Sequence, residues 1–204
     1  MIDWTPEQII LAAIPDKQPI EIAGIKIMKT VYPKARQISI GYDHVEDRMV
    51  FTSRFKDGRT RRALVTRRLL SRLLIRMSRE LYTTHPVAGR SPDPDEVLQM
   101  EHIAAVAHGL PEAQALPEKP GAQVTISQTG LVVDVQIETQ DEYLVLGLIS
   151  YPAEPVAGIK LTREKAHQLI RTFMEKAVAA EWDLENMTAW LEPLVCEHAS
   201  GKMI

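Results

Sequence analysis

The sequence contains little cysteine and few aromatic residues. Cys196 is the one cysteine among 204 residues, so the chain cannot form an internal disulfide or a metal site built from several thiolates. Aromatic residues make up 5% of the chain, which leaves few rings to stack on nucleobases. The longest strongly apolar run, residues 143–149, is far shorter than the roughly 20 residues that cross a bilayer.

Signatures of catalysis and of secretion are also missing. No G-x-G-x-x-G, P-loop, G-x-S-x-G or H-E-x-x-H pattern occurs. The first ten residues have neither a basic segment nor a continuous apolar stretch, which argues against a secretory signal. Apolar residues at 45% and charged residues at 25% are typical of a globular protein. From these features together we expect a cytoplasmic protein.

The histidines and the cysteine form no recognisable site. Glu101 and His108 lie seven residues apart on one predicted helix face, and two residues at this spacing cannot hold a metal ion without further ligands. Cys196 and His198 are close in sequence, but nothing positions them at a pocket as a nucleophile and its base. We therefore predict no catalytic residue, no metal and no cofactor.

The sequence does contain an order of elements that occurs twice. In each half, four strand-like segments precede an amphipathic helix, which is capped by Thr66 in the first half and by Thr162 in the second. Aligning these two threonines also aligns Leu73 with Leu169. The expected strands cover residues 24–31, 36–42, 48–55 and 59–65 in the first half, and 123–127, 131–138, 143–150 and 159–161 in the second.

These patterns predict an α+β fold of two tandem ββββα-type units, with antiparallel sheets backed by helices and with further peripheral helices. Internal duplication explains the order of elements, although any two capped amphipathic helices align about as well. Peripheral helices are expected at residues 6–14, 94–109 and 183–199. The predicted organisation is an N-terminal helix and the first unit over 1–84, a proline-rich connector with one helix over 85–122, and the second unit with a C-terminal helix over 123–204.

Charge is distributed unevenly along the chain. Residues 51–82 contain ten lysines or arginines and two acids, a net charge of +8. The other residues contain 14 basic and 25 acidic side chains, a net charge of −11. Such segregation suggests either an anionic ligand or an assembly in which a basic region contacts an acidic one.

Most of this basic charge lies on the helix after Thr66. Its apolar residues fill one sector that faces the core, namely Leu69, Leu70, Leu73, Leu74, Met77 and Leu81. Arg68, Arg72 and Arg79 lie opposite this sector, with Ile75 among them. This side is either the solvated face of an ordinary amphipathic helix or a contact surface, since arginine favours bidentate contacts with carboxylate and phosphate.

We predict a non-enzymatic binding or assembly protein that contacts an acidic surface, either of a partner protein or of another copy of the chain in a homo-oligomer. The predicted contact residues are Arg68, Arg72, Ile75 and Arg79, with Arg59, Arg61 and Arg62 from the preceding strand. An acidic group offers a counterpart in a second copy, namely Asp134, Glu138, Asp141 and Glu142.

Two alternatives stay open. The same basic face would serve a nucleic-acid-binding protein, although the isoelectric point of about 6.1 and the few aromatic residues favour this less. The second alternative is an enzyme with its site between the two units. We do not expect membrane binding, because the apolar face of the helix is needed for the core.

Overall fold

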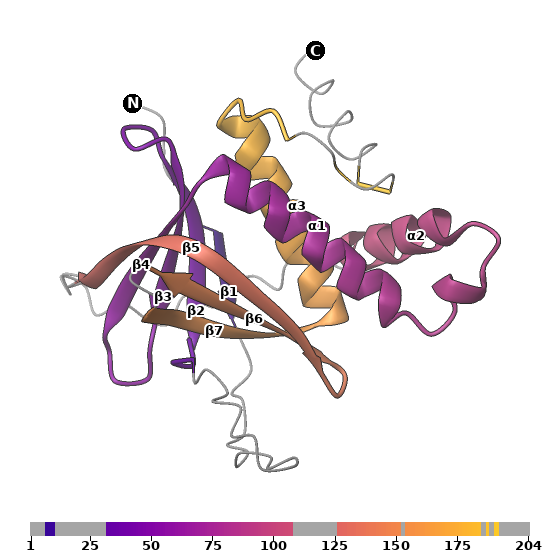
Figure 1. The fold of residues 1–204 in the computed structure, drawn as a ribbon, viewed down its shortest axis with the longest axis horizontal. Coiled ribbons are helices and arrows are strands. Elements are labelled where there is room, and N and C mark those ends of the chain that lie inside the picture. The colour runs from indigo at the N-terminus through magenta and orange to yellow at the C-terminus, as the bar shows by residue number, and fades with distance from the viewer. Residues whose placement is uncertain are drawn as a thin grey trace.

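The structure, a computed structural model, describes residues 7–10, 32–107, 126–151, 154–184, 187 and 190–191. It has an α+β fold in which a mixed β-sheet packs against helices (Figure 1). The strands are β1 (Glu7–Ile10), β2 (Gln37–Asp43), β3 (Arg48–Arg54), β4 (Thr60–Val65), β5 (Ile126–Gln140), β6 (Tyr143–Ser150) and β7 (Glu154–Thr162). The helices are α1 (Arg67–Thr83), the short 3₁₀ helix η1 (Ala88–Arg90), α2 (Pro94–Ala107) and α3 (Arg163–Ala179).

The strands follow one another across the sheet in chain order, from β1 to β7. Neighbours are antiparallel except β4 and β5, which are parallel. A second parallel contact joins Lys34, just before β2, to Gly158 on β7. Here Gly158 N donates to Pro33 O at 2.8 Å, and Ala35 N donates to Gly158 O at 3.3 Å. The sheet therefore curves until its last strand meets the segment that leads into β2.

One hydrophobic core lies between the curved sheet and helices α1 and α3. Alternate residues of the strands point into it, as the period of two along a strand requires, for example Met49 and Phe51 on β3 and Leu146 and Leu148 on β6. Residues from both halves of the chain belong to this core. None of the helices in the described part of the chain has the length and apolar character needed to span a membrane.

The second half differs from the prediction, because three strands rather than four precede its helix in the part of this half that the structure describes. Residues 128–130, expected as a turn, lie within β5. Their backbone continues as a strand because Arg62 and Ala63 of β4 pair with Thr129 and Gly130. In addition, β7 begins at Glu154 rather than near residue 159, and its pairing with β6 shifts register between Leu148 and Ile149.

Of the three predicted peripheral helices, one is confirmed by the structure. The connector helix is confirmed as α2. Glu7–Ile10 forms strand β1 rather than part of a helix, because all four residues pair with β2, and tertiary pairing outweighs the local capping pattern. The described residues between Asp183 and Leu191 are not helical. The strand expected at 24–31, His108, and Cys196 with His198 lie outside the described residues.

Candidate interaction surface

Helix α1 turns its arginines outward because its leucines are buried. The helix begins at Thr66, whose side-chain oxygen accepts a hydrogen bond from Leu69 N at 3.2 Å. The predicted apolar stripe is confirmed, since all six of its members are buried. The helix lies beside β5 on the outside of the molecule (Figure 1). Its opposite side therefore faces solvent.

Several arginines of the basic segment are used within the fold. Arg76 Nη1 donates to Val135 O on β5 at 2.6 Å and lies 3.7 Å from Asp134 Oδ1. Arg61 Nη1 lies 3.3 Å from Pro155 O and 3.4 Å from Val156 O, so this side chain reaches β7. Its guanidinium also lies over the Phe55 ring, 5.4 Å from the ring centre.

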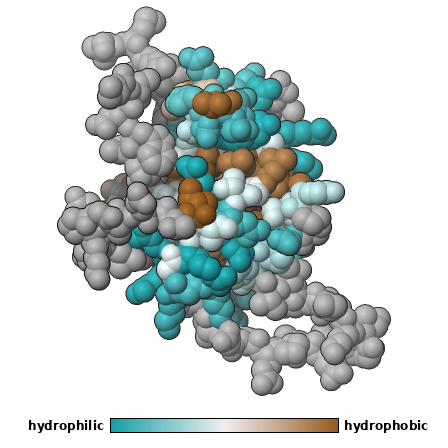
Figure 2. Space-filling model, turned by 90° about the vertical axis from the view of Figure 1, so that its left-hand side faces the viewer, coloured by the Kyte–Doolittle hydropathy of each residue, from teal (hydrophilic) through white to brown (hydrophobic). Residues whose placement is uncertain are grey.

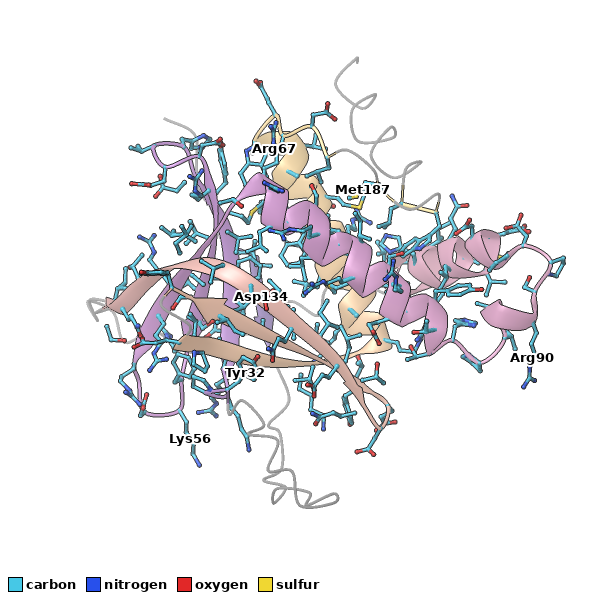
Figure 3. The ribbon with its side chains drawn as sticks, viewed as in Figure 1. Tyr32, Lys56, Arg67, Arg90, Asp134 and Met187 are labelled. Atoms are coloured by element: carbon cyan, nitrogen blue, oxygen red, sulfur yellow. The ribbon has the colours of Figure 1, made fainter. Side chains whose placement is uncertain are left out.

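Arg59 is also occupied by a contact within the fold. Its Nε donates to Asp57 Oδ2 at 2.7 Å within the β3–β4 turn. That turn also holds Lys56, which lies at the far end of the sheet from α1 (Figure 3). The structure therefore separates Arg59 and Arg61 from the arginines of α1, with which the sequence had grouped them.

Arg68, Arg72 and Arg79 remain exposed on α1. Among the residues that the structure describes, none forms a hydrogen bond or an ion pair with these three side chains. Ile75, predicted at the centre of this face, is half-buried. Arg62 is half-buried on β4, beside Thr129 of β5. We call Arg68, Arg72 and Arg79 the arginine face.

Exposed apolar residues lie on the strand beside this face. Leu131 and Val133 on β5 are 44% and 46% exposed, and Leu131 pairs with the half-exposed Leu64 of β4. The contact of Arg76 with Asp134 and its neighbour holds α1 against this part of β5. Arg72 is one helical turn before Arg76 on α1, and Leu131 and Val133 come shortly before Asp134 on β5. Figure 2, which shows the left-hand side of Figure 1, has a band of hydrophobic side chains between hydrophilic regions.

The predicted acidic group lies further along β5. Glu138, Asp141 and Glu142 are exposed at the closed end of the β5–β6 hairpin, which projects from the body of the molecule (Figure 1). Asp141 has a φ of 56°, the left-handed conformation that closes this tight turn. Asp134 lies closer to α1, where it faces Arg76 (Figure 3).

A partly buried polar network that sequence reasoning missed joins α2 to α3. The Arg163 guanidinium donates twice to the Glu101 carboxylate, each time at 2.8 Å. His167 Nε2 lies 3.1 Å from Glu101 Oε2, and His167 Nδ1 lies 3.3 Å from His102 Nδ1. His85 Nε2 lies 3.6 Å from the same carboxylate. The sequence signal was slight, since these residues come from three separate segments.

This network determines the protonation of Glu101. Burial alone raises the pKa of this carboxyl, but the Arg163 guanidinium and the His167 imidazole beside it outweigh burial and hold the pKa well below its usual value. The carboxylate is therefore ionised at neutral pH and fixes α2 to the start of α3. Within the described part of the chain, no group of His, Cys, Asp and Glu side chains is placed to hold a metal ion.

The chain matches no protein-family model, no curated protein and no solved structure.

Proposed function

We propose that this protein binds an acidic polypeptide surface through the arginine face of α1. One observation carries the proposal: Arg68, Arg72 and Arg79 have no internal partner among the described residues, whereas Arg59, Arg61 and Arg76 do. Three like charges along one helix side are mutually repulsive. A carboxylate-bearing partner relieves this repulsion and offers the bidentate geometry that guanidinium favours.

The neighbouring side chains favour protein over nucleic acid as the partner. Phe51 and Phe55, the aromatic residues within the basic segment that precede α1, are buried in the core and cannot stack on bases. Leu131 and Val133, in contrast, expose apolar surface beside the arginines. Apolar surface flanked by charge is common at protein interfaces, where arginine is enriched.

The test compares the chain with an Arg72→Glu/Arg79→Glu variant. Two fluorescein-labelled probes are titrated in about 50 mM salt, a twenty-residue peptide of alternating Glu and Leu, and a twenty-nucleotide single strand of DNA. We expect the acidic peptide to bind the wild-type chain and to bind the variant roughly tenfold more weakly or worse, since tenfold corresponds to about 1.4 kcal/mol.

A matched control has the same change in net charge elsewhere. Lys56→Glu/Arg90→Glu alters two exposed residues at opposite ends of the molecule, both distant from the arginine face (Figure 3), and it should bind the peptide as the wild type does. Circular dichroism verifies that each variant is folded. Equal binding by both variants contradicts the proposal, and a clear preference for DNA favours the nucleic-acid alternative, with a steep decline in affinity as salt rises.

The other alternative, an enzyme site between the two units, gains no support from the packing. Both halves contribute to one apolar core, with Phe51 of the first half against Phe173 of the second at 5.2 Å between ring centres. The core at this contact consists of apolar side chains.

We also propose that the two halves are repeats of one βββα unit, shorter than the predicted ββββα unit. Thr66 and Thr162 cap their helices alike, each accepting a backbone hydrogen bond at 3.2 Å. Asp47 and Asp141 close the corresponding hairpins in the left-handed conformation. The parallel pairing of β4 with β5 also has a counterpart in the contact between β7 and Lys34.

A further inference from the structure

The surface that contains α1 and β5 changes from basic side chains at one end to acidic side chains at the other. Arg76 faces Asp134 near the middle of β5, and Glu80 Oε2 accepts from Thr139 Oγ1 at 3.1 Å near its end. Helix and strand therefore advance in the same direction. The N-terminal half of α1, with Arg68 and Arg72, is the half farther from the hairpin end of its own chain.

The two ends of this surface differ in charge. The arginines of the first two turns of α1 form a basic end. Leu131 and Val133 give an exposed apolar region beside the start of this helix. The tip of the β5–β6 hairpin, with Glu138, Asp141 and Glu142, is the acidic end. Figure 1 shows this tip projecting beyond the sheet, where a second molecule can reach it.

A surface that is basic at one end and acidic at the other is complementary to itself. A twofold axis through its middle, near the contact of Arg76 with Asp134, places the basic end of each copy against the acidic end of the other. We propose that the acidic partner of Arg68 and Arg72, at the basic end of the arginine face, is the β5–β6 hairpin of a second copy of this chain, in a twofold symmetric dimer. This inference rests on the proposed function, since it names the partner of the same surface.

Charge complementarity supports a second copy as the occupant. The basic segment has a net charge of +8 and the rest of the chain −11, so a copy of the chain supplies both signs. The contact of Arg76 with Asp134 within one chain already joins the same two elements that the dimer joins between chains. An isologous contact also closes on itself, so this arrangement ends at two copies and does not continue as a fibre.

The experiment is an exchange of charges between the two ends. One variant has Arg68→Glu/Arg72→Glu, which makes the basic end acidic, and the other has Glu138→Arg/Glu142→Arg, which makes the hairpin basic. Light scattering on a sizing column measures their masses at about 50 mM salt. We expect the wild type to be a dimer and each variant alone to be a monomer, because both contacts of each homodimer then join like charges.

Mixing the two variants restores both contacts at once. The acidic α1 of one variant meets the basic hairpin of the other, and the remaining hairpin and α1 have their natural signs. We therefore expect a dimer to reappear in the equimolar mixture. The wild-type dissociation constant should also rise about tenfold or more between 50 and 500 mM salt, because exposed ion pairs are screened. The Lys56→Glu/Arg90→Glu control should remain a dimer.

Three results overturn the inference: a wild type that is monomeric at about 100 μM, charge-reversed variants that still dimerise, or a mixture that remains monomeric. Arg68→Gln/Arg72→Gln serves as a second variant if charge reversal impairs folding, and it should weaken the dimer. A monomeric wild type that still binds the acidic peptide through Arg72 and Arg79 contradicts this inference alone. Loss of peptide binding as well contradicts the proposed function.

Discussion

The immediate neighbours of each arginine decide whether it serves the fold or the surface. Arg76 and Arg61 donate to backbone carbonyls of β5 and β7, which satisfies acceptors that burial would otherwise leave costly. Arg72 is only one helical turn from Arg76, yet no hydrogen bond or ion pair is formed with it by any residue that the structure describes. The position of an arginine on α1, and not its residue type alone, therefore determines whether its side chain bonds within the fold, as Arg76 does, or is available to a partner, as Arg72 is.

Glu101 gives the clearest prediction at the residue scale. Its carboxylate receives two hydrogen bonds from Arg163, and Glu101→Gln removes the charge that these bonds require. We expect the free energy of unfolding at pH 7 to fall by roughly 1–3 kcal/mol, the range for hydrogen bonds to charged groups. Urea unfolding at pH 7, 5 and 3 measures this difference.

The difference between wild type and Glu101→Gln should depend on pH. The pKa of Glu101 in the folded protein is held below its unfolded value of about 4.3. Its stabilising contribution is therefore complete above that pH and declines as the pH falls toward the folded pKa. Glu46→Gln, at an exposed turn position, is the control and should change stability little. A Glu101→Gln deficit that is unchanged between pH 7 and pH 3 contradicts this account.

At the scale of single elements, the two capping threonines can be compared directly. Thr66 and Thr162 each accept a backbone hydrogen bond at the start of a seventeen-residue helix. Replacing either by alanine should lower the free energy of unfolding by about 1 kcal/mol, as urea unfolding measures. Thr83→Ala, near the other end of α1, tests the effect of losing a threonine without losing a cap, and its cost should be clearly smaller. Caps with very different costs contradict the equivalence of the two helices.

Elements governed by local pattern were predictable from sequence, and α1 is the best example. Its cap and its buried stripe follow from the spacing of threonine, leucine and arginine alone. The continuous strand β5 did not follow, because residues 128–130 have the composition of a turn and are extended only through their pairing with β4. The same holds for Glu7–Ile10, which pairs with β2 although its local sequence favours a helix.

Contacts between segments that are distant in sequence account for the remaining features that the sequence did not predict. Gly147 and Gly158 face each other across β6 and β7, and the ring of Tyr32 lies against both, so that a Cβ on Gly158 would lie 2.6 Å from Tyr32 Cβ. The hydroxyl of Tyr32 donates to the Gln136 side chain on β5. No period or motif in the sequence predicts this contact of Tyr32, because it forms only when β5, β6 and β7 lie side by side in the fold. The network around Glu101 escaped prediction for the same reason.

At the scale of the whole molecule, the segregation of charge links stability to association. A dimer that joins the basic end of one copy to the acidic end of another adds its association free energy to the folding of the two chains together. The midpoint of urea unfolding should therefore be higher at about 100 μM protein than at about 1 μM, since a hundredfold change in concentration corresponds to about 2.7 kcal/mol per dimer. Arg68→Glu/Arg72→Glu should unfold at the same urea concentration in both samples. If the wild type also unfolds at one midpoint at both concentrations in 50 mM salt, the chain folds without a partner copy, and the arginine face is left for an acidic protein of another kind.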